Sequence, residues 1–226
     1  MPKLTDFAAL IFDMDGLVLD TEPTYCAAWL QAIETMGFKA YPNAFNALSG
    51  HHYRQVEAQL IDWYGEDFNL PEFRQISGEQ WRHVVRANGI AIKSGVLELI
   101  DYAEQNQLPI ALATNSSAVN AFECLYLAGI KHKFPVIVTG DDVQRVKPEP
   151  DIFLTAAERL HIDIKNCLVL EDSYTGITAA VAAGTCTVYI PSRLPANPHA
   201  VKLATITLND MLHIFDNLPL LALNGI

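Results

Sequence analysis

The sequence predicts an α/β fold: a doubly wound parallel sheet with a small all-helical domain inserted after the first strand. From residue 95 onward, short apolar runs of strand length alternate with helical segments. These runs are apolar throughout rather than half polar, as is typical of parallel strands covered on both faces. The stretch 23–88, in contrast, contains helical patterns and no convincing strand. We therefore predict a core domain of residues 1–22 and 89–226 and a helical domain of residues 23–88.

Composition limits the class of partner. The chain has 226 residues, enough for a core domain with an insertion, and a formal net charge of −11. Nucleic acid is disfavoured as a partner because phosphate backbones are bound by clusters of Lys and Arg, and only 15 basic residues are spread along the chain. A small phosphorylated molecule remains possible, since a metal ion and a lysine can make one pocket locally positive.

The sequence also bears on compartment. It has no apolar run near the roughly 18 residues of a membrane span. The amino terminus lacks a basic region followed by an apolar segment and a cleavage site. The four cysteines form no Cys-x-x-Cys pair and are interpreted as reduced thiols. We expect a cytoplasmic protein that does not bind membranes, and a monomer by default.

The first predicted strand is the apolar run 7–12, which ends abruptly on acidic residues. Four carboxylates follow within ten residues: Asp13, Asp15, Asp20 and Glu22. An acid at the carboxyl end of a buried strand lies where open α/β sheets bind their ligands. Taken alone, the pattern also fits a solvated turn rich in Asp and Gly.

In the inserted segment, apolar residues recur at three- and four-residue spacing, which indicates helices. All three tryptophans of the chain, Trp29, Trp63 and Trp81, fall here. We interpret them as core residues of the helical domain rather than as a stacking platform for a ligand.

After the insertion, helices and strands alternate. The predicted helices are 96–105, 118–128, 152–160 and 175–183, and the predicted strands are 109–113, 135–139, 167–170 and 186–190.

Polar residues follow these later strands as well. Thr114 ends one strand, Lys147 lies in a loop, and Glu171 with Asp172 ends another. Each has a local explanation, such as a helix cap or an exposed loop. Because the carboxyl ends of parallel strands face one crevice, their repeated occurrence there predicts a single site.

The motifs resemble those of the haloacid-dehalogenase-like hydrolases, in the branch whose helical cap is inserted after the first strand. The first motif of that family is similar to residues 13–21, Asp-Met-Asp-Gly-Leu-Val-Leu-Asp-Thr. Its second is similar to Thr114, its Lys-Pro-x-Pro-Asp motif to residues 147–151, and its acidic motif to Glu-Asp-Ser at 171–173. Order, spacing and cap position agree over nearly the whole chain.

The resemblance implies roles for five residues. Asp13 would be the nucleophile that forms an aspartyl-phosphate, which divides hydrolysis into two steps. Asp15 would be the general acid toward the leaving oxygen and then the general base for water. Thr114 and the backbone N–H of Asn115 would hold phosphoryl oxygens. Lys147 would offset the negative charge of Asp13 and the phosphate.

The resemblance also implies a cofactor. Mg²⁺ would be held by the Asp13 carboxylate, the Asp15 backbone carbonyl and Asp172, all hard oxygen ligands. Glu171 would act through a bound water. Either Ser116 or Ser117 could add a hydrogen bond, but the sequence does not favour that assignment.

The substrate is less well defined. The Asp-Thr-Glu-Pro turn, which contains Glu22, resembles phosphatase members that act on sugar phosphates. Glu22 and His52 are candidate substrate contacts, together with His51 and Arg54, because the cap of this branch closes over the pocket. Two exposed histidines in a loop are an equally good explanation.

The residues at these positions discriminate between several activities. Asp15 favours phosphate over halide chemistry, because the dehalogenases lack a second Asp and need no Mg²⁺. The alternative within the family is a sugar-phosphate mutase like β-phosphoglucomutase, which uses cap Arg and Lys. Residues 55–92 contain no Lys, which favours the phosphatase, although Arg74, Arg82 and Arg86 are present. A two-component receiver domain is disfavoured by the late acidic pair and by the insertion. A non-catalytic binding protein is disfavoured because every catalytic position is filled. The sequence predicts a Mg²⁺-dependent phosphatase of sugar phosphates or nucleoside monophosphates.

Overall fold

The computed structural model describes residues 4–41, 44–45, 48 and 53–217. The chain divides into two compact units: residues 1–19 with 92–226, here called the sheet unit, and residues 20–91, here called the helical unit. The predicted domain boundaries, after residue 22 and before residue 89, fall three residues inside the helical unit at each end.

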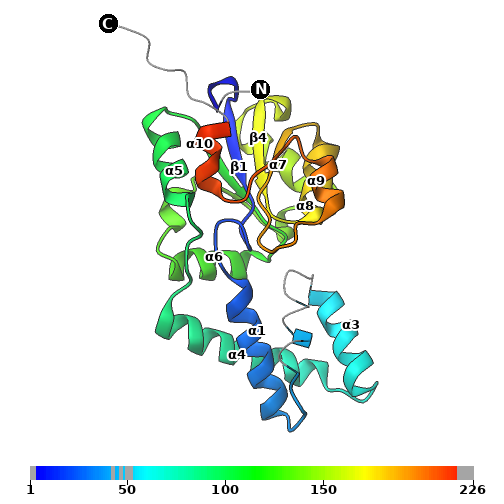
Figure 1. Ribbon diagram of the computed structural model, residues 1–226. Coiled ribbons are helices and arrows are strands. Elements are labelled where there is room, and N and C mark those ends of the chain that lie inside the picture. The colour runs from blue at the N-terminus through cyan, green and yellow to red at the C-terminus, as the bar shows by residue number, and fades with distance from the viewer. Residues whose placement is uncertain (1–3, 42–43, 46–47, 49–52, 218–226) are drawn as a thin grey trace, which may run out of the picture. The chain divides into compact units, whose positions relative to one another are not determined.

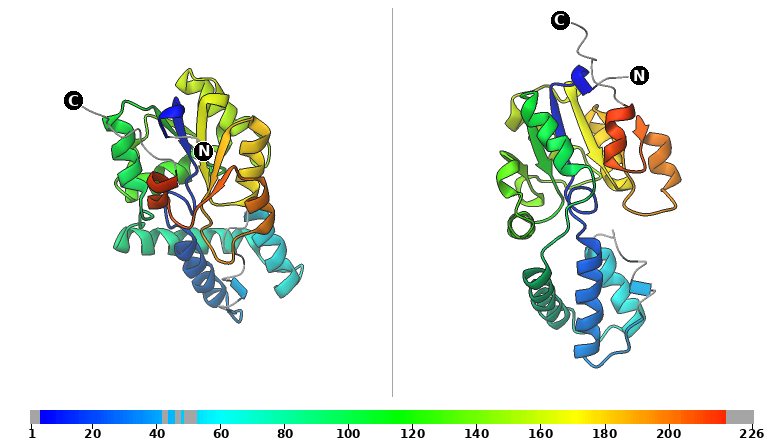
Figure 2. Two further views of the ribbon diagram at one scale, coloured as in Figure 1. Left: turned by 45° about the horizontal axis from the view of Figure 1, so that its top comes forward. Right: turned by 60° about the vertical axis from the view of Figure 1, so that its left-hand side comes forward.

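The sheet unit is built on six parallel strands in the order β3-β2-β1-β4-β5-β6 (Figures 1 and 2). The strands are β1 (Ala9–Phe12), β2 (Ile110–Ala113), β3 (Val136–Val138), β4 (Cys167–Glu171), β5 (Cys186–Tyr189) and β6 (Ile206–Thr207). The chain runs outward from β1 in one direction and then outward from β4 in the other. The carboxyl ends of β1 and β4 therefore form the switch point at which such sheets bind ligands.

Helices cover this sheet. They are α5 (Val96–Gln105), α6 (Ala118–Leu127), α7 (Asp151–Leu160), α8 (Tyr174–Ala183), α9 (Pro198–Leu203) and α10 (Ile214–Asn217). Helices α7 and α8 share one buried cluster with Ala9, Ile11 and Val169 of the central strands. Because side chains alternate along a strand, Phe12 points to the opposite face, where its ring meets Phe134 edge-on at 5.8 Å.

The predicted α/β fold is confirmed, and each predicted strand and helix of the sheet unit is present within a few residues of its expected bounds. Strand β6 was not predicted, because two residues carry no periodic signal.

The described residues of the helical unit contain helices and no strand. The main helices are α1 (Glu22–Thr35), α3 (Tyr53–Tyr64) and α4 (Leu70–Asn88). Trp81 is buried, stacks on Tyr25 with ring centroids 5.6 Å apart, and donates from Nε1 to the Thr24 hydroxyl at 3.0 Å. Trp29 and Trp63 are partly buried against the apolar core of the unit. The tryptophans thus pack within the unit, as predicted.

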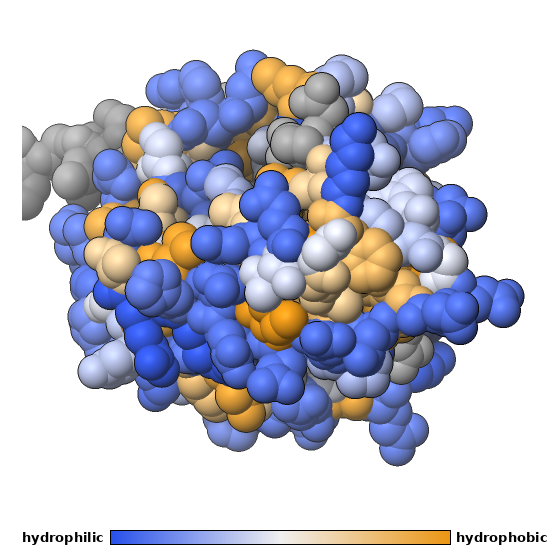
Figure 3. All heavy atoms as spheres, turned by 90° about the horizontal axis from the view of Figure 1, so that it is seen from below, coloured by the Kyte–Doolittle hydropathy of each residue, from blue (hydrophilic) through white to orange (hydrophobic). Residues whose placement is uncertain are grey.

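The surface carries polar and apolar side chains in mixture. On the face shown in Figure 3, hydrophilic residues predominate and apolar residues form separate smaller groups. Within the described ranges, no helix combines the length and the apolar character that crossing a bilayer requires.

Candidate active site

Side chains from three neighbouring strands meet at the carboxyl edge of the sheet. Asp13 directly follows β1, and its N–H donates to the Leu170 carbonyl at 3.0 Å. Thr114 directly follows β2, and its N–H donates to the Val138 carbonyl at 2.9 Å. Glu171 is the last residue of β4. Because the sheet hydrogen bonds continue to these positions, the strands fix where each side chain leaves the backbone.

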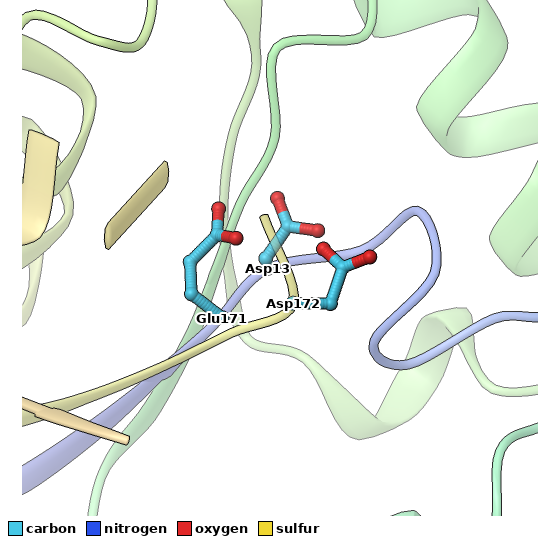
Figure 4. A group of neighbouring side chains, drawn as sticks. All are labelled: Asp13, Glu171 and Asp172. Atoms are coloured by element: carbon cyan, nitrogen blue, oxygen red, sulfur yellow. The ribbon is translucent and has the colours of Figure 1, made fainter. Parts of the chain in front are cut away.

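Three carboxylates gather at the switch point. Asp13, Glu171 and Asp172 each offer an oxygen, and these oxygens all lie within 4.8 Å of one another (Figure 4). Asp13 comes from the end of β1 and the other two from the end of β4. Hard divalent cations prefer such oxygen ligands, so the donor set fits a metal ion of this kind.

Gly16 makes room for this cluster. Its φ of +86° is the left-handed conformation that glycine adopts at little cost, and a Cβ there would lie 2.3 Å from Asp172 Oδ2. The Gly of the Asp-x-Asp-Gly motif therefore lets the turn after β1 pass directly beside Asp172.

Lys147 joins two of these three carboxylates. Its ammonium donates to Asp13 Oδ1 at 2.5 Å, to Glu171 Oε1 at 2.7 Å and to the Ala113 carbonyl at 2.9 Å. An ammonium has three N–H donors, so all three are used within the protein. The side chain is only 3% exposed, and Nζ also lies over the Phe153 ring, 4.7 Å from its centroid.

Burial and the neighbouring charges shift the pKa values of Lys147 and Asp13. Burial alone would lower the pKa of Lys147, but Asp13 and Glu171 outweigh it and hold the pKa above its ordinary value. Burial raises the pKa of the Asp13 carboxyl, Lys147 opposes that rise, and the charge of Glu171 adds to it. Lys147 is therefore a permanent cation in the site.

The loop that carries Lys147 is held by Asn115. The Asn115 amide accepts from the Lys147 N–H at 2.9 Å and donates to the Lys147 carbonyl at 3.2 Å. The sequence had suggested only a backbone role for Asn115. The two residues are 32 positions apart, so no local sequence pattern indicates that they are in contact. The only signal is the residue type, because the Asn amide can both donate and accept a hydrogen bond.

Asp15 is held by two hydroxyls that follow β2. Its Oδ2 accepts from Ser116 Oγ at 2.8 Å and from Thr114 Oγ1 at 3.3 Å. The Ser116 N–H in turn donates to Thr114 Oγ1 at 3.0 Å. Ser116 therefore orients Asp15, and the hydrogen bond to the phosphoryl group that the resemblance implies for Ser116 or Ser117 stays a prediction.

Five of the predicted core positions, Asp13, Asp15, Thr114, Lys147 and Asp172, thus lie at one edge of the sheet unit, joined by Glu171 and by the Asn115 loop. Glu22 is the first residue of α1 and belongs to the helical unit. His51 and His52 lie outside the described residues, as does the side chain of Arg54. The substrate contacts assigned to these residues stay predictions.

Comparisons with known proteins agree with this geometry. A family model described as haloacid dehalogenase-like hydrolase matches residues 10–190. The fructose-1-phosphate phosphatase YqaB of Escherichia coli (strain K12) is 33% identical over 180 residues, which cover 79% of this chain and 93% of that protein. A phosphorylated carbohydrates phosphatase of Thermotoga maritima is 31% identical over 181 residues, which cover 80% of this chain and 83% of that protein.

A solved structure gives the same result for the fold. The putative beta-phosphoglucomutase from Thermotoga maritima superimposes with a TM-score of 0.81 at 28% identity, covering 93% of this chain and 97% of that one. The family model spans both the acidic turn after β1 and the acidic pair at the end of β4. Motif order, sheet topology and sequence similarity agree, and the chain belongs to the haloacid dehalogenase-like hydrolases.

Proposed function

We propose that this protein is a Mg²⁺-dependent phosphatase that hydrolyses small phosphorylated metabolites, sugar phosphates or nucleoside monophosphates, through an aspartyl-phosphate. The observation that carries the proposal is the environment of Asp13, a buried carboxylate fixed by Lys147 at the switch point of the sheet. The named phosphatases to which the chain is similar support the reaction class and favour sugar phosphates.

In the first step, an Asp13 oxygen attacks the phosphorus, and the bond from phosphorus to the leaving oxygen breaks. Asp15 gives a proton to that leaving oxygen, so the alcohol departs neutral. In the second step, water attacks the phosphorus, the bond from phosphorus to the Asp13 oxygen breaks, and the water gives a proton to Asp15. This step releases inorganic phosphate and restores both carboxyl groups.

The remaining groups bind and orient the phosphoryl group. The Lys147 ammonium offsets the negative charge that Asp13 and the phosphate bring together. The Thr114 hydroxyl accepts from the Ser116 N–H, so its own proton is available to turn from Asp15 toward a phosphoryl oxygen. The backbone N–H of Asn115 would add a second donor.

Mg²⁺, when bound, supplies positive charge that orients the phosphate and neutralises the charge in the transition state. The Asp13 and Asp172 carboxylates and the Asp15 backbone carbonyl would hold it. Glu171 would contribute through water, because Lys147 engages its Oε1 and Ser173 engages its Oε2.

The test is phosphate release from p-nitrophenyl phosphate, fructose 1-phosphate, other sugar phosphates and nucleoside monophosphates, with Mg²⁺ or EDTA. Metal-dependent release supports the proposal, and the best substrate names its class. Interconversion of glucose 1- and 6-phosphate without free phosphate would instead support a mutase, which the similarity to a putative beta-phosphoglucomutase keeps as the second candidate. Ligand binding without turnover would support a non-catalytic protein.

We also propose that the protein is a cytoplasmic monomer. The spacing of the four cysteines, which form no Cys-x-x-Cys pair, favours reduced thiols and so supports a reducing compartment. Light scattering in solution tests the monomeric state.

Metal binding is testable without turnover. At a Mg²⁺ concentration of 100 Kd, we expect stabilisation of about 2.7 kcal/mol, because the ion binds the folded chain. Such a value raises the melting temperature of a chain of this size by roughly 5–10 °C. Asp172→Asn should lose most of this shift, whereas Asp163→Asn, which replaces an exposed capping carboxylate, should keep it. An equal shift in both variants would contradict the ligand assignment.

Ser116→Ala removes one of the two hydroxyl groups that donate to Asp15 Oδ2. A hydrogen bond to a charged group contributes about 1.5–3 kcal/mol, so we expect kcat to fall by at least about tenfold with little change in KM. Ser117→Ala is the matched control, because the Ser117 hydroxyl caps α6 by accepting from the Asn120 N–H. It should lower stability by about 1 kcal/mol and leave kcat unchanged. A kcat for Ser116→Ala equal to that of the control would rule out the role of Ser116.

A further inference from the structure

Gly176 lies where the carboxyl group of Glu171 leaves no room for a side chain. It is the third residue of α8, and its N–H donates to the Ser173 hydroxyl that caps the helix, at 3.0 Å. A Cβ at Gly176 would lie 1.6 Å from Glu171 Oε1, 1.9 Å from Cδ and 2.4 Å from Oε2. All three of these nearest atoms belong to the carboxyl group itself.

The Glu171 carboxylate is fixed on this first turn of α8. Its Oε2 accepts from the Ser173 N–H and from Ser173 Oγ, each at 2.9 Å, and its Oε1 accepts from Lys147. The residue is 1% exposed, and the amino-terminal end of a helix favours a negative charge. The carboxylate cannot move away from Gly176 without losing one of these hydrogen bonds.

We infer that Gly176 is a positioning residue of the active site. Its missing side chain lets Glu171 lie across the start of α8 and hold the Lys147 ammonium against Asp13. Any Cβ at position 176 would push the carboxylate aside and leave Lys147 with Asp13 and one carbonyl as acceptors. The expected effect on rate rests on the proposed phosphatase function, whereas the packing of Gly176 on Glu171 does not.

The test compares two glycines inside helices. Gly176→Ala should lower kcat/KM by about 10- to 100-fold, the scale of losing one preorganised electrostatic partner. It should also lower the melting temperature in EDTA. Gly78→Ala in α4 is the matched control, because the nearest atom to a Cβ there is Arg82 Nη1 at 3.6 Å, an ordinary contact. Since alanine favours helix, Gly78→Ala should keep full activity and melt at the same or a higher temperature.

A second substitution at position 171 distinguishes a positioning role of Gly176 from a general loss of stability. Glu171→Asp retracts the carboxyl group by one methylene and clears the space at position 176. In that background, Gly176→Ala should cost less than about threefold in kcat/KM and should not lower the melting temperature, the non-additivity expected of residues in contact.

Two results would overturn the inference. One is that Gly176→Ala and Gly78→Ala have the same kcat/KM and melting temperature. The other is that Gly176→Ala lowers kcat/KM by the same factor whether residue 171 is Glu or Asp. If the parent protein releases phosphate from no substrate, the proposed function fails instead. The melting temperatures in EDTA then still decide whether Gly176 acts through Glu171.

Discussion

Asp13→Asn is expected to reduce phosphate release at least ~10³-fold, because without the covalent nucleophile only binding and electrostatic effects remain. The asparagine keeps the shape of the side chain and can still accept from Lys147. Loss of rate therefore reports loss of the attacking oxygen and not loss of the site. Steady-state release with Mg²⁺ measures it, and Asp13→Ala excludes slow deamidation back to Asp as a source of residual rate. Release within tenfold of the parent in both variants would exclude Asp13 as the nucleophile.

The same substitution should not destabilise the metal-free protein. The folded-state pKa of Asp13 is raised above its unfolded value, chiefly by burial, although Lys147 opposes the rise. Such a group contributes less to stability as pH rises above the unfolded value near 3.8, because ionisation is harder in the folded chain. At neutral pH in EDTA, Asp13→Asn should therefore melt at or above the temperature of the parent, and its advantage should shrink toward pH 4. A clearly lower melting temperature at neutral pH would show that the Asp13–Lys147 attraction outweighs the cost of burial.

Much of this site could be predicted from the sequence because its parts follow apolar runs. The strands end on Asp13, Thr114 and Glu171, and parallel strands bring such ends to one edge. The strand bounds were predictable for the same reason, since an apolar run bounded by polar residues is itself the signal.

The contacts that orient these groups were not predictable in the same way. Ser116 reaches Asp15 across 101 positions, and Asn115 reaches Lys147 across 32. Such pairs depend on loop conformation and side-chain rotamers, which periodicity does not encode. Gly176 is a further case: the sequence does not show what a glycine near a helix start makes room for until the side chain lying against it is known.

Lys147→Met is expected to reduce activity by ~10²–10³-fold or more, the scale of removing a preorganised group that stabilises transition-state charge. Methionine keeps most of the length and the contact with Phe153 but removes the charge. It leaves Asp13 and Glu171 facing each other without their shared cation. Removing one partner of a buried ion pair costs about 3–5 kcal/mol, so the melting temperature in EDTA should fall strongly.

Lys147→Met should also change how the stability of the protein depends on pH. The pKa of Lys147 is raised in the folded state, so its contribution to stability is fully present below the unfolded value of 10.5 and is lost only as pH rises above that. Between pH 5 and 8 it stays constant in the parent. In Lys147→Met, the pKa of Asp13 should rise further because Lys147 no longer opposes the rise, so the variant should lose stability more steeply than the parent as pH rises over this range.

Lys133→Met is the matched control, because Lys133 also bridges two carboxylates, Asp101 at 3.2 Å and Glu104 at 3.1 Å, but at the surface. Water solvates those carboxylates when the lysine is removed, so activity, melting temperature and pH slope should stay near those of the parent. The comparison isolates burial, since both lysines have two acidic partners. Equal activity, melting temperature and pH slope in the two variants would contradict the prediction. Lys147 would then contribute no more than a surface lysine in an ion pair, and the proposed chemistry would not depend on it.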